Sequence, residues 1–171
     1  VVEAWLPYLK VSRVLVADNE AAESQLVKAA MGLAVQGSIQ VDIQPIEKVD
    51  FASMSLDSVK TLVLVREITG AVAAKRKGLH LKHLNVGNVH FSSGRKQIAP
   101  SVFLAPQEVD QLTMLAEEGA DVEVRAVPND RPVRLESRRN DAHLVHVDTP
   151  SEGYTHPVRA TCSGMLNNFG T

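Results

Sequence analysis

The sequence predicts an α/β domain built on a mostly parallel sheet with helices on both faces. Strand-like apolar runs alternate along the chain with segments of helical spacing, beginning with VSRVLVA at 11–17 and the helical pattern that follows it. The run KTLVLV at 60–65 is almost continuously apolar, as expected of a strand covered on both faces. Repetition of this strand-then-helix order is typical of a doubly wound sheet.

The elements can be placed in order along the chain. Strands are predicted at 11–17, 38–44, 60–65, 81–86 and 120–127, with a further extended piece at 97–105 interrupted by Pro100. Helices are predicted at 20–34, 46–56, 67–78 and 106–118. Pro106 falls in the first turn of the last helix and Gly119 directly follows its end, which is the usual placement of these two residues.

The regular pattern ends near Leu135. The stretch 136–171 contains one strand-like run, 142–147, among many Ser, Asn, Pro, Gly and charged residues. Such a composition supplies little apolar surface for a core. We therefore expect a single α/β domain over 1–135, followed by a poorly ordered C-terminal tail over 136–171.

Composition excludes several classes of protein. The chain has 18 Lys and Arg against 20 Asp and Glu, a net charge of −2, so general nucleic-acid binding has little support. Its single cysteine, Cys162, cannot form an internal disulfide, and no Cys/His set has the spacing of a structural zinc site. No apolar run approaches the roughly 20 residues of a membrane-spanning helix. We expect a soluble cytoplasmic protein that needs no metal and no cofactor.

The histidines are weak candidates for chemistry. His80 and His83 lie three residues apart beside a strand, a spacing that puts them on opposite faces and disfavours a metal pair. His90 follows the turn Asn-Val-Gly-Asn, yet no Ser, Cys or carboxylate stands in a sequence-defined relation to it. The favoured interpretation of His90 is a partly exposed residue that leads into a hairpin. Gly87 and Gly94 form neither the dinucleotide-binding pattern nor the P-loop pattern.

Small polar residues follow three of the predicted strands. Asp18, Arg66 and the turn of Asn85, Gly87 and Asn88 all fall at strand ends. The carboxyl ends of parallel strands meet at one edge of a sheet, where ligands of such folds bind, and backbone N–H groups there can hold an anion. These five residues are therefore candidates for the rim of a pocket. Ordinary polar turns would give the same pattern, and both interpretations remain open.

Three separated segments, VSRVLVADNE, LNVGNVHFSSGRKQI and ADVEVRAVPNDRP, together resemble the IIB component of the mannose/fructose/sorbose class of the bacterial phosphotransferase system. The resemblance covers Val1 to about Leu135. It implies a cytoplasmic phosphocarrier with a doubly wound fold. Such a carrier accepts a phosphoryl group from a IIA partner on a histidine and passes it to a sugar entering through the IIC and IID membrane components.

The sequence departs from the family at its N-terminal motif, D-x-R-L-I-H-G-Q-V, which carries the reactive histidine. The opening VVEAW is similar to the residues that directly follow this motif, so Val1 would lie three positions after that histidine. The motif is absent here, and no other histidine takes its role. We therefore name no catalytic residue and leave open whether the chain is an enzyme.

The resemblance also implies that the first strand, which directly precedes this motif in the family, is missing from the predicted sheet, and the run 142–147 is a candidate substitute. Two interpretations follow: a transferase component that is active when the motif is present, or a non-catalytic interaction module. In either case Asp18 could orient a histidine or cap the following helix, with the cap preferred. Arg95 could contact phosphate or the acidic surface of a partner, or it could lie in a solvated turn.

Overall fold

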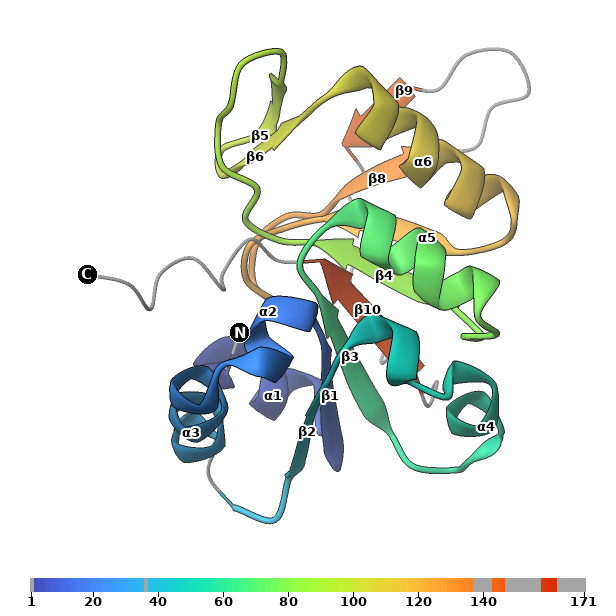
Figure 1. The fold of residues 1–171 in the computed structure, drawn as a ribbon. Coiled ribbons are helices and arrows are strands. Elements are labelled where there is room, and N and C mark those ends of the chain that lie inside the picture. The colour runs from blue at the N-terminus through green and yellow to red at the C-terminus, as the bar shows by residue number, and fades with distance from the viewer. Residues whose placement is uncertain (1, 36, 137–142, 147–157, 163–171) are drawn as a thin grey trace.

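A computed structural model describes residues 2–35, 37–136, 143–146 and 158–162, and it contains one large mixed sheet covered by helices (Figure 1). The strand order is β2-β1-β3-β10-β4-β7-β8-β9. The first six strands of this order are parallel, and β8 and β9 extend the sheet in antiparallel fashion at one edge. The predicted α/β class with a mostly parallel sheet is confirmed.

Most strand bounds agree with the predicted runs to within a few residues, whereas 133–136 and 158–162 were not predicted as strands. The parallel strands are β1 Arg13–Ala17, β2 Gln40–Gln44, β3 Thr61–Val65, β4 His83–Val86, β7 Asp121–Val124 and β10 Val158–Cys162. The antiparallel strands of the sheet are β8 Val133–Glu136 and β9 His143–His146. The extended piece around Pro100 is a separate hairpin of β5 Lys96–Ala99 and β6 Val102–Leu104.

Helices cover both faces of the sheet, as predicted. The helix bounds are α1 Val2–Leu9, α2 Asn19–Glu23, α3 Gln25–Ala34, α4 Phe51–Leu56, α5 Ile68–Arg76 and α6 Pro106–Glu117, with a 3-10 turn, η1, at Ile46–Lys48. One apolar cluster centres on Trp5 of α1 and includes the inner side of α3. The other joins α4, α5 and α6 around Phe51 and Leu112. Burial of these two clusters against the sheet stabilises the layered fold.

The predicted helix over 20–34 is two helices, because Ser24 interrupts it. Ser24 is extended, with φ −89° and ψ 111°, and its hydroxyl accepts a hydrogen bond from the Val27 N–H at 3.2 Å. A serine that caps the next helix offers the backbone an alternative to continuing the previous one. The prediction over 46–56 is divided in the same way, since Asp50 caps α4 through the Ser53 N–H at 3.0 Å.

Two segments of the expected tail are strands of the main sheet. β9 pairs antiparallel with β8 at the sheet's edge, while β10 lies in the interior, parallel to both β3 and β4. The interior position is thus taken by 158–162, and the suggestion that 142–147 fills it is wrong. The remaining residues expected to form the tail lie outside the described part of the chain.

Candidate functional site

The loops after β1, β3 and β4 lie along one edge of the sheet. β1 and β3 are parallel neighbours with Ala17 opposite Val65, and β10 joins β3 to β4 in the same direction. All three loops therefore leave from the carboxyl ends of parallel strands, where doubly wound folds bind ligands. We call this edge the carboxyl rim; it carries Asp18, Arg66, Asn85, Gly87 and Asn88. The backbone of β10 ends on it as well, with Cys162 opposite Val65 and Val86.

Asp18 and Arg66 form an ion pair that joins two of these loops. Arg66 Nε lies 2.6 Å from Asp18 Oδ2, and Arg66 Nη2 lies 3.1 Å from Asp18 Oδ1. The third guanidinium nitrogen, Nη1, lies 2.8 Å from Glu20 Oε2. Asp18 Oδ1 also accepts the Ala21 N–H at 2.7 Å and so caps α2. This two-pronged geometry fixes the direction of the guanidinium group.

The pair shifts the pKa values of both partners. Burial by itself would raise the pKa of Asp18, but the hydrogen bond and positive charge of Arg66, with the Ala21 and Glu20 N–H groups, hold that pKa below its usual 3.8. The hydrogen bond to Asp18 is the main cause of the raised pKa of Arg66. Both groups are therefore charged at neutral pH.

Asn85 and Asn88 bring two amide oxygens to the carboxyl rim. Asn85 is fully buried, and its Nδ2 donates to the Arg125 carbonyl oxygen at 3.1 Å. The Oδ1 atoms of Asn85 and Asn88 are buried, and neither accepts a hydrogen bond from the described part of the chain. Gly87, between them, is buried too. A buried acceptor without a donor is costly, so these oxygens suit a ligand group that carries N–H or O–H.

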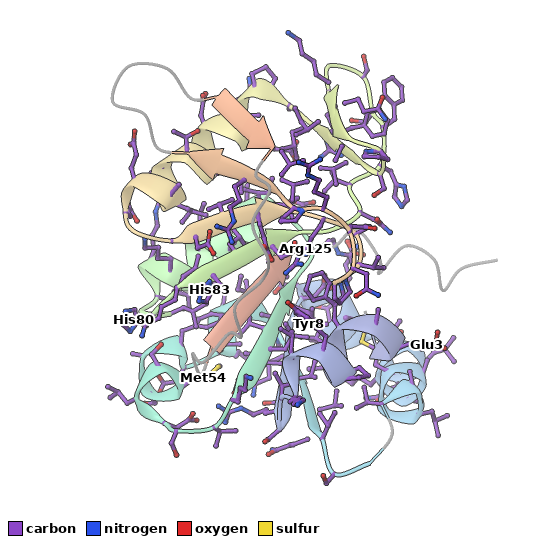
Figure 2. The ribbon with its side chains drawn as sticks, turned by 180° about the vertical axis from the view of Figure 1, so that it is seen from behind. Glu3, Tyr8, Met54, His80, His83 and Arg125 are labelled. Atoms are coloured by element: carbon purple, nitrogen blue, oxygen red, sulfur yellow. The ribbon has the colours of Figure 1, made fainter. Side chains whose placement is uncertain are left out.

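A cluster around Arg125 flanks the carboxyl rim and was not predicted. Arg125 donates to Glu123 Oε1 at 3.0 and 3.1 Å, and its guanidinium lies 5.2 Å from the Trp5 ring and 5.6 Å from the Tyr8 ring (Figure 2). Trp5 Nε1 donates to the Ala126 carbonyl oxygen at 3.0 Å. The alternating run at 121–125 already puts residues 123 and 125 on one face of a strand. Nothing in the sequence indicated that helix α1, which carries Trp5 and Tyr8, packs against Arg125.

His90 and Arg95 lie in the hairpin region and not in the Asp18–Arg66 cluster. His90 is exposed, and its carbonyl oxygen accepts from Arg95 Nη1 at 3.1 Å. Arg95 also forms a forked ion pair with Glu108, at 2.6 and 3.1 Å. The guanidinium thus fastens this loop to α6.

His80 and His83 lie at the amino ends of the parallel strands, opposite the carboxyl rim. His83 begins β4, and its Nδ1 is 3.3 Å from Asp121 Oδ2 at the start of β7. His80 lies nearby and is exposed, and both lie away from Tyr8 and Arg125 (Figure 2). Among the described residues there is no group of three or more His, Cys, Asp or Glu that could hold a metal ion.

An open polar groove of about 330 Å³ lies between the β1–β2 pair and α4. Its lining includes Arg13, Asp42, Lys48 and Asp57, and Arg13 Nη2 is paired with Asp57 Oδ2 at 2.6 Å. The lining reaches from Arg13 at the start of β1 to Gln44 at the end of β2. None of the predicted site residues lines it.

The fold, with polar loops gathered at the carboxyl ends of its parallel strands, places this chain among the doubly wound α/β proteins. Residues 1–149 match the family described as PTS system sorbose subfamily IIB component. The chain therefore belongs to this family of the phosphotransferase system, and it is a IIB component that acts in sugar phosphotransfer.

Individual relatives agree with the family match. The chain is 26% identical over 132 residues to the N-acetylgalactosamine-specific phosphotransferase enzyme IIB component 2 of Escherichia coli (strain K12), covering 77% of this chain and 84% of that protein. It is 23% identical over 128 residues to the PTS system fructose-specific EIIB component of Bacillus subtilis (strain 168), covering 74% and 78%. Both matches span most of each protein.

Solved structures show the same fold. The N-acetylgalactosamine-specific IIB component 1 from Escherichia coli superposes with a TM-score of 0.69 at 25% identity, covering 75% of this chain and 86% of that one. The IIBSor domain of the sorbose permease from Klebsiella pneumoniae gives a TM-score of 0.68 at 19% identity, covering 76% and 81%. In the described part of this chain, every helix is too short or too polar to cross a bilayer.

Proposed function

We propose that this chain is the body of a cytoplasmic phosphocarrier that works between a IIA protein and the IIC and IID membrane components, serves a sugar of the mannose/fructose/sorbose type, and takes up the phosphoryl group on the histidine of the family's N-terminal motif. The observation that carries the proposal is the Asp18–Arg66 pair, which holds a cation at the carboxyl rim of a IIB fold. Relatives named for N-acetylgalactosamine, fructose and sorbose support this sugar class.

Arg66 is the proposed cation for the transferring phosphoryl group. Asp18 holds two of its nitrogens from a buried position, whereas Glu20, which holds Nη1, has a side chain that is 78% exposed. An exposed ion pair contributes little, so a phosphoryl oxygen can replace Glu20 while Asp18 keeps the guanidinium in place. The exchange brings positive charge to the phosphoryl oxygens, where phosphoryl transfer requires it.

In the proposed transfer the attacking imidazole is neutral. Its free nitrogen forms a bond to phosphorus as the bond from phosphorus to the donor imidazole of IIA breaks. The attacking imidazole releases the proton on its other nitrogen to solvent, and this loss balances the proton that the donor imidazole takes up from solvent. Asn85 and Asn88 Oδ1 are the proposed acceptors for an imidazole N–H or a sugar hydroxyl, because these oxygens suit donors and not an anion. Gly87 lets the backbone come close to the ligand.

A second candidate, a non-catalytic IIB-like module that binds IIA without carrying phosphate, is favoured by one observation. The 171-residue sequence contains no R-L-I-H-G-Q motif, and none of the five proposed rim residues is a histidine. Both candidates use the carboxyl rim as the IIA-binding surface. They differ only in whether the chain takes up the phosphoryl group.

Both candidates make the claim that the carboxyl rim binds IIA. To test it, isotope-labelled chain is titrated with unphosphorylated IIA protein, and binding is monitored through the backbone amide chemical shifts. We expect chemical-shift changes around Asp18, Arg66 and the 85–89 turn. We also expect an Arg66→Gln variant to bind IIA at least fivefold more weakly than the unmodified chain. His83→Gln, at the other edge of the sheet, serves as the matched control and binds as the unmodified chain does. Shift changes centred on His83 and Asp121 would contradict the proposal.

A further inference from the structure

The outer side of α3 is an exposed apolar stripe. Leu26 is 78% exposed and Leu33 is 82% exposed, although leucine is normally among the buried residue types. Ala29, between them, is exposed and Ala30 is half-buried. None of these four side chains is ionisable. We call Leu26, Ala29, Ala30 and Leu33 the α3 stripe.

The α3 stripe is separate from the side of the helix that holds α3 to the domain. Val27, Met31 and Val35 pack against the apolar cluster around Trp5. At 3.6 residues per turn the stripe points the other way. Figure 1 shows α3 at the periphery of the molecule, on the side of β1 and β2. The domain itself therefore does not need Leu26 or Leu33 to be leucine.

The spacing of the α3 stripe is symmetric about its own centre. Leu26 lies as far before the Ala29–Ala30 pair as Leu33 lies after it. When two copies of α3 pack antiparallel across a twofold axis at that point, Leu26 of each copy meets Leu33 of the other. The alanines then meet at the axis, where small side chains allow the helices to approach within about 8–10 Å. An isologous interface requires this self-complementarity.

We propose that the α3 stripe is the contact surface for a second copy of this chain, in an antiparallel helix pair. The antiparallel arrangement also sets each helix's N-terminus beside the other's C-terminus, which is electrostatically favourable. A ten-residue helix covers less than the ~800 Å² per partner of a standard interface, so we expect a dissociation constant of roughly 100 µM. The proposal does not depend on the phosphocarrier role.

Sedimentation of the full chain over a range of concentrations tests the association. We expect the apparent mass to rise from monomer towards dimer near the dissociation constant, and Leu26→Glu with Leu33→Glu to weaken dimerisation at least tenfold. Leu56→Glu is the matched control, because Leu56 is 88% exposed but lies on α4. Purely monomeric behaviour at 1 mM, or equal weakening by the control, would overturn the proposal.

Disulfide trapping in a Cys162→Ser background tests the geometry. Ala29→Cys should link to itself across the axis, because its two Cα atoms come close enough for a disulfide bond. Leu26→Cys should not link to itself, since its copies lie about 10 Å apart along the helix axis, but should link to Leu33→Cys in a mixture. Self-linking of Leu26→Cys without the mixed product would show a parallel or unrelated contact and overturn the antiparallel assignment.

Discussion

Asp18 combines two roles at one position. Its carboxylate caps α2 through the Ala21 N–H and holds Arg66 through two nitrogens. From the sequence, Asp18 could cap the following helix or orient a histidine, with the cap preferred. The structure shows the cap, and the same carboxylate also orients an arginine on the neighbouring loop. The cap could be expected from the local sequence, whereas the contact with Arg66 could be predicted only by knowing that β1 pairs with β3.

Substitution of Asp18 separates these roles. Asp18→Asn can still cap the helix but lacks the negative charge, so we expect it to lower the free energy of unfolding by about 2 kcal/mol. Asp18→Ala loses the cap as well, at a further cost of about 1 kcal/mol. Urea unfolding measures both changes. Glu23→Gln, an exposed change on α2, is the control, and an Asp18→Asn variant as stable as the control would refute the assigned role.

The same carboxylate gives the fold a defined pH dependence. Despite burial, which acts to raise it, the pKa of Asp18 in the folded chain is below its unfolded value because of Arg66 and the backbone N–H groups. The stabilisation is therefore complete above the unfolded pKa of about 4 and is lost as the pH falls through the lower, folded pKa. Urea midpoints measured between pH 2 and 7 should fall less steeply below pH 4 in Asp18→Asn. Equal slopes would contradict the shift.

At the scale of whole elements, α1 closes the molecule around Arg125. Trp5 and Tyr8 place their rings beside that guanidinium, and the Trp5 indole reaches Ala126, 121 positions further along the chain. Trp5 is 2% exposed. Helix α1 therefore ties the start of the described chain to the loop after β7, on the flank of the carboxyl rim.

Trp5 should be among the most sensitive positions of the fold. Trp5→Ala removes a buried ring that is also one of the two rings beside Arg125, so we expect a loss of about 3–5 kcal/mol in the free energy of unfolding. Trp5→Phe keeps a ring but loses the indole donor, at about 1–2 kcal/mol. Guanidinium unfolding distinguishes these values. Glu3→Gln, on the exposed side of α1, should change the free energy of unfolding little. A Trp5→Ala variant within 1 kcal/mol of Glu3→Gln would refute the role of Trp5 in holding α1 against Arg125.

The sequence predicted elements best where the signal was local. The continuous apolar run of β3 and the Pro and Gly that bound α6 gave correct elements, because burial on both faces and helix termini leave local marks. The break at Ser24 was missed, since a serine inside an apolar pattern also fits a continuous helix. Arg125 was missed because its aromatic partners lie more than a hundred residues away.

At the scale of the whole molecule, β10 completes the sheet between β3 and β4. Its backbone pairs with both, from Val158 opposite Thr61 to Cys162 opposite Val86. Strand VRATC was not predicted, since it lacks the continuous apolar character of β3 and its pairing is entirely long-range. The resemblance to the family predicted an unfilled interior position, and only the three-dimensional structure shows which segment occupies it.

Proline in β10 should disrupt the sheet at its centre. Ala160→Pro removes an N–H from an interior strand, so we expect a loss of about 3 kcal/mol or more in the free energy of unfolding and faster hydrogen exchange in β3 and β4. Ala160→Gly keeps the N–H and should cost about 1 kcal/mol or less. Amide exchange read by mass spectrometry checks both variants. Unchanged protection of β3 and β4 in Ala160→Pro would show that β10 does not support them in solution.

The central claim is that these residues form the frame around a phosphoryl-transfer site whose reactive histidine belongs to the family's N-terminal motif. It is tested most directly by incubating the 171-residue chain with phosphorylated IIA protein and mapping any modified residue by mass spectrometry. We predict no label on this chain, and label on the motif histidine when the R-L-I-H-G-Q segment is joined ahead of Val1. Label on His90, or on any other histidine of the 171 residues, would contradict the account.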